Sequence, residues 1–153
     1  VADAIAHATQ LNEEAATKFR NGEIDVALNL YEKALGDVED YTDEEASPIK
    51  IRTQRNLALL YSKKGAWRKS LLYANQVLEK LPDDLKALMR KIESLINIES
   101  FDEAKKELQR ALTLTKNDPA FVALRTKLEN SQKQARQREN QAYAKMFAKS
   151  TKE

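Results

Sequence analysis

Basic and amide side chains occur four residues apart in two segments of this 153-residue chain. Lys86 and Arg90 form one such pair, and Arg52 and Asn56 form another. Four residues is slightly more than one helical turn, so each pair would share one face of a helix. Lys and Arg bind carboxylates through charge-assisted hydrogen bonds, and an Asn amide both donates to and accepts from a peptide main chain. These residue types therefore favour the binding of an acidic peptide.

The composition argues against most kinds of enzyme. The chain has no Cys, which excludes a disulfide framework, a thiolate zinc site and a cysteine nucleophile. Its one His, His7, leaves no His-rich metal site. The three glycines, Gly22, Gly36 and Gly65, lie too far apart for a phosphate-binding loop. We therefore expect no catalytic site, no metal and no cofactor in this chain.

Few helix breakers and many Ala, Leu, Lys and Glu residues predict an all-α fold. The longest apolar run covers only residues 57–61, so no membrane span is expected. The opening Val-Ala-Asp-Ala does not resemble a signal peptide, and a first residue other than Met indicates a piece of a longer chain. The lack of Cys fits a reducing compartment. The expected location is the cytoplasm, with the nucleus as an additional one.

A pattern of small and apolar residues recurs three times along the chain. It begins at Ala27, Ser70 and Ala104, and places small or apolar residues at offsets 0, 4, 7 and 8. This spacing puts one stripe on one helix face. A second helical run precedes each stripe, so each unit is predicted to be a helix pair. The second and third patterns start 34 residues apart, and an acidic insertion of nine residues lengthens the first interval to 43.

A 34-residue helix–turn–helix repeat resembles the tetratricopeptide repeat, and the match covers about residues 8–116. It is best in the second repeat, which has the family residues in order: Leu57, Ala58, Tyr61, Gly65, Trp67 and Pro82. The resemblance implies a right-handed α-solenoid of three repeats, about 8–46, 48–82 and 83–116. Ala15 replaces the usual Gly of the first repeat, and the third lacks the turn Gly and the closing Pro. The alternative is an unrelated helical bundle.

The sequence predicts a long final helix in the extension formed by residues 117–153. Asn117-Asp118-Pro119 marks its start, and apolar residues between Phe121 and Leu128 could cover the open end of the repeats. From 131 to 141 the only apolar residue is Ala135, so this stretch should project into water as a polar helix. An apolar patch follows at helical spacing: Tyr143, Met146 and Phe147.

The positive charge is concentrated in this extension. Residues 131–153 carry six Lys or Arg against two Asp or Glu, whereas residues 1–130 carry 20 against 22. A basic amphipathic end is typical of calmodulin targets and membrane-surface segments, and the patch could also support self-association. A nucleic-acid role is not expected, because almost no aromatic residues alternate with the basic ones.

In stacked repeats the first helix of each pair lines a groove. The tetratricopeptide domains of co-chaperones, which this chain resembles, use a "carboxylate clamp" there to bind the terminal Glu-Glu-Val-Asp of heat-shock proteins 90 and 70. Its Lys, Asn, Asn, Lys and Arg align here with Asn12, Ala16, Asn56, Lys86 and Arg90. Asn12 and Ala16 depart from the family pattern, which implies a partial clamp of Asn56, Lys86, Arg90 and Asn12. Arg52 and Lys63 are accessory candidates on the second repeat.

The segment Gln-Ala-Tyr-Ala-Lys-Met-Phe-Ala-Lys at 141–149 is similar to the closing helix of large immunophilins, of the FKBP and cyclophilin types. These carry a peptidyl-prolyl isomerase (rotamase) domain before three tetratricopeptide repeats. The resemblance implies that this chain is a non-enzymatic co-chaperone adaptor for the C-terminus of heat-shock protein 90, with heat-shock protein 70 as a second candidate. One alternative is a scaffold that holds another protein or a second copy of itself. Another is a basic tail that binds calmodulin or nucleic acid.

Overall fold

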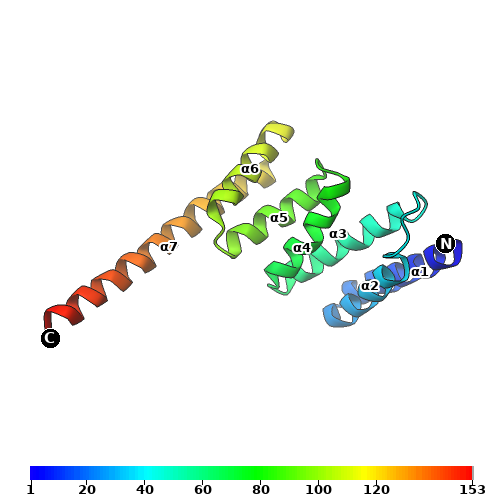
Figure 1. The fold of residues 1–153 in the computed structure, drawn as a ribbon, viewed down its shortest axis with the longest axis horizontal. Helices are drawn as coiled ribbons and strands as arrows, with labels where there is room; N and C mark the ends of the chain where they lie inside the picture. The colour runs from blue at the N-terminus through cyan, green and yellow to red at the C-terminus, as the bar shows by residue number, and fades with distance from the viewer. Residues whose placement is uncertain (153) are drawn as a thin grey trace. The chain divides into compact units, whose positions relative to one another are not determined.

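The structure is a computed structural model that describes residues 1–152, with side chains as far as residue 150. Within these residues the chain forms helices joined by short loops and no strand (Figure 1). The helices are α1 (Ala2–Arg20), α2 (Ile24–Val38), α3 (Ser47–Lys63), α4 (Trp67–Lys80), α5 (Leu85–Asn97), α6 (Phe101–Thr115) and α7 (Pro119–Lys152). The predicted all-α fold is confirmed.

The turns within the helix pairs require a left-handed backbone. Gly22 (φ 83°) stands between α1 and α2, and Gly65 (φ 74°) between α3 and α4. Only Gly adopts this conformation without a steric penalty from Cβ. Between α5 and α6 the same conformation falls on Glu99 (φ 64°), which is where the third repeat lacks its turn Gly. The backbone geometry of the turn thus persists where the sequence signal is lost.

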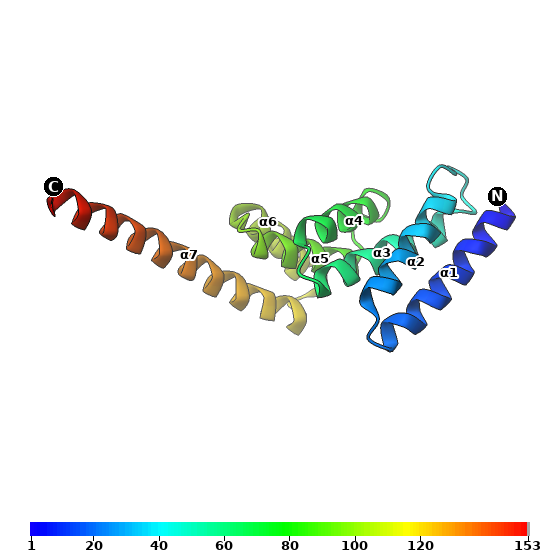
Figure 2. The same ribbon diagram turned by 90° about the horizontal axis from the view of Figure 1, so that it is seen from below.

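The chain forms two compact units, an N-terminal unit (Val1–Ser94) and a C-terminal unit that begins at Leu95, and the boundary falls within α5. In the N-terminal unit, α1 and α2 lie antiparallel and side by side, and α3 packs with α4 in the same way (Figures 1 and 2). Ala8, Ala15, Ala27 and Ala34 are completely buried, which lets the axes of α1 and α2 approach closely.

A polar cluster ties α2, α3 and α4 together. The Glu32 carboxylate accepts hydrogen bonds from the hydroxyl of Tyr61 at 2.7 Å and from that of Tyr73 at 3.0 Å. The two tyrosine rings stack with their centroids 5.8 Å apart, and Lys69 Nζ lies 5.1 Å from the Tyr61 centroid. Burial, helped by the hydrogen bond to Glu32, raises the pKa of Tyr61 to about 12, and burial with the Glu32 charge also raises the pKa of Tyr73. Both hydroxyls are therefore held in the protonated, donating form.

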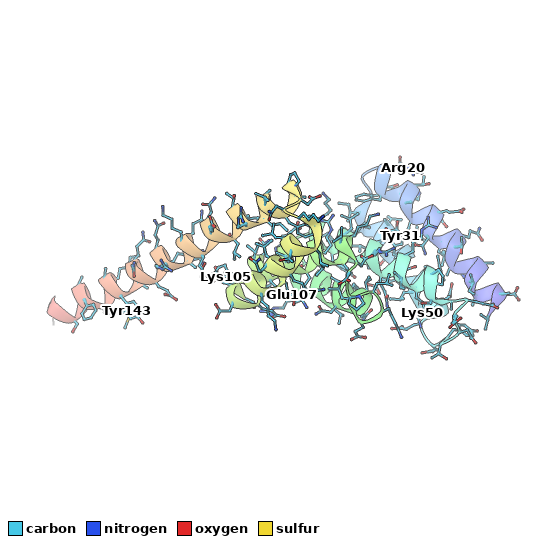
Figure 3. All side chains as sticks on the ribbon, turned by 90° about the horizontal axis from the view of Figure 1, so that it is seen from above. Arg20, Tyr31, Lys50, Lys105, Glu107 and Tyr143 are labelled. Carbon is cyan, nitrogen blue, oxygen red and sulfur yellow. The ribbon has the colours of Figure 1, made fainter. Side chains whose placement is uncertain are left out.

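In the C-terminal unit, α6 packs on the first part of α7. Leu108 and Leu112 of α6 are buried together with Phe121 and Leu128 of α7. The second part of α7 extends away from α6, and Figure 3 shows Tyr143 near its end. Tyr143, Met146 and Phe147 are 60–70% exposed. In residues 1–152, no helix is both long and apolar enough to cross a membrane.

Candidate functional site

A cavity of about 340 Å³ in the N-terminal unit lies among α3, α4 and the first part of α5. Its apolar wall comes from alanine, leucine and valine side chains of these helices. Its polar lining residues are Arg52, Arg55, Asn56, Lys86 and Arg90. The structure thus brings together Arg52 and Asn56 from α3 with Lys86 and Arg90 from α5, as expected for two helices that each present one face to a groove.

Arg55 pairs with Asp84, the residue that caps the first turn of α5. The sequence alone did not indicate Arg55 as a groove residue. Its Nε donates to Asp84 Oδ2 at 3.2 Å, and its Nη2 pairs with Asp84 Oδ1. Asp84 Oδ2 also accepts the backbone N–H of Ala87 at 3.0 Å, which satisfies one of the free N–H groups in the first turn of α5. An Asp just before a predicted helix is a capping signal, but its arginine partner lies 29 residues earlier in the sequence. This link fixes α5 against α3.

The cavity carries a surplus of positive charge. None of its lining residues is acidic. Arg90 Nη1 lies 3.5 Å from Glu93 Oε2, so that guanidinium is partly compensated by a neighbour on its own helix. Within the described part of the chain, Lys86 and Arg52 have no ion-pair partner, and both side chains are exposed. An anion that enters the cavity could therefore pair with Lys86 or Arg52 without breaking an existing ion pair.

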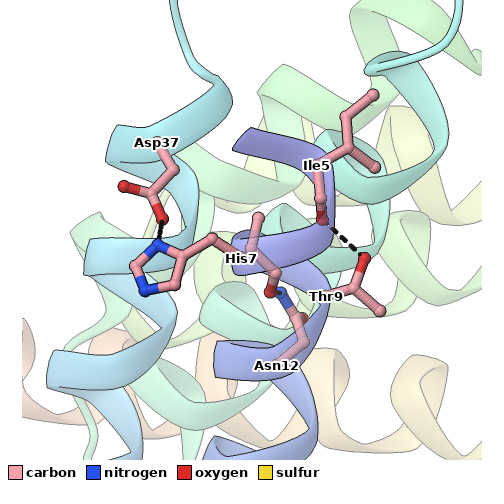
Figure 4. Close-up of polar contacts among 6 residues, drawn as sticks. Ile5, His7, Thr9, Asn12 and Asp37 are labelled. Carbon is pink, nitrogen blue, oxygen red and sulfur yellow. Dashed lines mark hydrogen bonds and ion pairs between the residues drawn. The ribbon is translucent and has the colours of Figure 1, made fainter. Parts of the chain in front are cut away.

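Asn12 lies beneath the groove surface, between α1 and α3. It is 1% exposed, and its Nδ2 donates to Ala8 O and to Thr53 Oγ1, both at 2.9 Å. Its Oδ1 accepts from Asn56 Nδ2 at 3.4 Å. Figure 4 shows Asn12 on α1, together with the His7–Asp37 pair that joins α1 to α2 at 2.5 Å. Asn12 does not line the cavity but contacts Asn56, which does.

The other predicted residues lie outside the cavity. Lys63 is exposed at the end of α3 and is not among the lining residues, and neither is the half-buried Ala16. Arg52 lines the first cavity and also reaches towards α1, where it borders a smaller cavity of about 250 Å³ with Thr9 and Glu45. Burial raises the pKa of the Tyr31 hydroxyl, and the nearby positive charge of Arg52 offsets part of this rise. The groove's charge thus comes from α3 and α5.

The described residues contain no cluster of His, Cys, Asp and Glu suited to a metal ion. Nothing in the lining of the cavity combines a nucleophile with a base, since its polar groups are guanidinium, ammonium and amide. The arrangement can bind anions and main-chain amides by charge and hydrogen bonding.

Comparison with known proteins identifies the kind of protein that has this fold and this groove. The family model "Tetratricopeptide repeat" matches residues 61–128. FK506-binding protein 59 of Drosophila melanogaster is 24% identical over 95% of this chain. Human peptidyl-prolyl cis-trans isomerase FKBP4 is 27% identical over 97% of it. The chain spans 34% of the length of each of these relatives.

Solved structures agree with the sequence relatives. The C-terminal tetratricopeptide domain of a putative FK506-binding protein from Plasmodium falciparum has a TM-score of 0.77 and 26% identity, covering 88% of this chain and 93% of that one. The first tetratricopeptide domain of Spaghetti (RPAP3), solved with the HSP90 peptide SRMEEVD, has a TM-score of 0.69 and 22% identity. It covers 83% of this chain and 94% of its own.

The chain has the helical-solenoid fold of tetratricopeptide-repeat domains, and residues 61–128 match the model of that family. Its relatives over nearly the whole length are FK506-binding proteins. The predicted fold and the resemblance to immunophilin domains are confirmed.

Proposed function

We propose that this domain is a co-chaperone adaptor whose groove binds the acidic C-terminal peptide of heat-shock protein 90. The observation that carries the proposal is the cavity itself, which collects Asn56, Lys86 and Arg90 with two further polar residues, Arg52 and Arg55, and no acidic residue. Cations from two helices facing one cavity are suited to a peptide with several carboxylates. The Spaghetti domain, solved with SRMEEVD, supplies the candidate ligand.

Each group has a distinct task in this proposal. Lys86 and Arg90, one turn apart on α5, bind the side-chain carboxylates of the two glutamates. Asn56 bonds to the terminal residue of the peptide, and its hydrogen bond to Asn12 Oδ1 restrains its orientation. The apolar wall of α4 residues Ala74 and Val77 excludes water from these contacts.

The charge contribution is tested by replacing both cations of α5. Lys86→Ala with Arg90→Ala should abolish binding of SRMEEVD measured by calorimetry, since each charge-assisted hydrogen bond contributes about 1.5–3 kcal/mol. The matched control is Lys133→Ala with Arg136→Ala on the exposed part of α7, which removes the same charge and should leave the affinity unchanged. Equal affinities for the Lys86/Arg90 variant and the wild type would refute the groove assignment.

The domains that lie outside this chain, its location and its further partners are also proposals. Because this chain spans 34% of the length of its FK506-binding relatives, we assign a separate peptidyl-prolyl isomerase domain to the remainder of the protein. The location in the cytoplasm is a prediction from the sequence. Heat-shock protein 70, calmodulin and self-association through α7 stay predictions from the sequence.

The burial of Asn12 favours a second candidate function, a scaffold that no longer binds the chaperone. Asn12 is committed to α1–α3 packing, and the Ala16 side chain has no hydrogen-bonding atoms, so α1 offers neither a cation nor an amide at these two clamp positions. A flat titration with SRMEEVD together with a dimer in sedimentation would support this function over the first.

A further inference from the structure

The last turns of α7 carry apolar and basic side chains on an exposed stretch of helix. Tyr143, Met146 and Phe147, the apolar patch, are 60–70% exposed. Beyond Leu128 no described side chain of α7 is buried, and this stretch extends away from α6 (Figures 2 and 3). The proposed peptide groove lies in the N-terminal unit, whereas α7 belongs to the C-terminal unit. The patch is therefore a feature that the proposed function does not use.

Positive charge borders this patch. Lys145 and Lys149 are four residues apart, and Lys149 follows Met146 by three residues, so the two ammonium groups lie beside the apolar side chains. Both lysines are exposed, and neither forms an ion pair with another described residue. Glu139, one turn before Tyr143, is the one acidic residue between positions 131 and 150, and it borders the same hollow as Tyr143 and Met146. The end of α7 is thus both apolar and positively charged.

We propose that this end of α7 is a peripheral membrane-binding element that lies flat on an anionic lipid surface. The two aromatic rings and the methionine enter the headgroup region, while Lys145 and Lys149 remain at the lipid phosphates and carboxylates. A second copy of the chain is disfavoured as the occupant, because residues 131–153 carry six basic against two acidic residues in each copy, and these segments would repel each other. A lipid surface offers the opposite charge and needs no shaped pocket, which suits a convex helix with a small apolar patch.

The test measures co-sedimentation of the whole chain with phosphatidylcholine vesicles that either contain or lack phosphatidylserine. The wild type should bind the anionic vesicles about tenfold more strongly than the neutral ones, and added salt should weaken this binding. Met146→Gln with Phe147→Gln should weaken it about tenfold or more, because the apolar contacts are lost. Lys145→Gln with Lys149→Gln should have a similar effect through the lost charges. Glu139→Gln should strengthen binding, because it removes the negative charge beside the patch.

Exposed residues of α4 and α6 provide the matched controls. Leu72→Gln with Leu114→Gln removes two exposed leucines, and Lys105→Gln with Lys106→Gln removes two exposed charges. Both variants should bind the anionic vesicles as the wild type does, and circular dichroism should show equal helicity for all variants.

Three results would overturn the proposal: no vesicle binding by the wild type, equal binding to both kinds of vesicle, or wild-type binding by both the Met146/Phe147 and the Lys145/Lys149 variants. A dimer in sedimentation that the Met146/Phe147 variant abolishes, without vesicle binding, would assign the patch to a second copy instead. The α7 variants should bind SRMEEVD with wild-type affinity in calorimetry, so a failure of the membrane proposal leaves the proposed function standing.

Discussion

Asn12 shows how a single side chain can change from a ligand-binding role to a structural one. Its amide lies between α1 and α3 and joins Ala8 O, Thr53 Oγ1 and Asn56. Thr53 in turn donates to Ile49 O at 2.7 Å, so a buried chain of hydrogen bonds crosses the helix interface. Asn56, which lines the groove, is held in position by its hydrogen bond to Asn12.

Replacing this amide should therefore cost stability. Asn12→Ala leaves buried polar groups without a partner and should lower the free energy of unfolding by about 1–3 kcal/mol. Urea unfolding followed by circular dichroism measures the change. Asn29→Ala, at an exposed position of α2, is the matched control and should shift it by less than about 0.5 kcal/mol. If the two variants are equally stable, the hydrogen bonds of Asn12 contribute nothing to the fold.

At the scale of elements, α7 combines two kinds of helix in one. Its first part packs on α6 through Phe121, Leu124 and Leu128, which are 3–6% exposed. Beyond Leu128 no described side chain of α7 is buried. An exposed ion pair between Arg138 and Glu99 joins this second part to the rest of its unit, and both side chains are at least half exposed. The second part therefore contributes little to the folded core.

Removing the second part should leave the domain intact. Deleting residues 131–153 removes the exposed ion pair between Arg138 and Glu99. An exposed ion pair contributes about 0–1 kcal/mol, so the free energy of unfolding should change by less than about 1 kcal/mol. Leu128→Ala is the comparison, because truncating this buried leucine should cost about 2–5 kcal/mol. Denaturant unfolding of both variants and calorimetry with SRMEEVD provide the measurement. A deletion as damaging as Leu128→Ala would show that the projecting part supports the fold.

At the scale of the whole molecule, the Glu32–Tyr61–Tyr73 cluster makes stability depend on alkaline pH. The pKa of Tyr61 is about 12 in the folded protein against 10.0 for a free side chain, so the unfolded chain releases this proton first as the pH rises. The stability from this group is complete below pH 10 and is lost as the pH rises from 10 towards about 12.

Glu32→Gln should weaken this dependence, because it removes the charge and the charged acceptor that help to keep Tyr61 protonated. Urea midpoints measured below pH 10 and between pH 10 and 12 should fall less steeply in this variant than in the wild type. Glu44→Gln, in the loop before α3, removes the same charge at an exposed site and should retain the wild-type slope. Identical slopes for the two variants would contradict the role of Glu32.

The sequence predicted the fold well because its signals are local. The offsets that begin at Ala27, Ser70 and Ala104 lie within single helices, and Gly22 and Gly65 mark turns directly. The groove residues followed from the same periodicity. What the sequence did not predict depends on pairs distant along the chain, such as Arg55 with Asp84, or on the depth of one side chain, as for Asn12. Periodicity assigns a residue to a face, but it does not tell how far the side chain reaches from it.

The length of the exposed part of α7 sets the distance between the apolar patch at its end and the packed part of the helix. A helix rises about 1.5 Å per residue, so Tyr143 lies about 22 Å along the axis beyond Leu128, the last buried residue. Any molecule held by Tyr143, Met146 and Phe147 would be kept at that distance from α6 by the number of residues between them. Adding four residues, slightly more than one helical turn, would lengthen the spacing by about 6 Å and rotate the apolar patch by about 40°, so the number of residues sets both its reach and its direction.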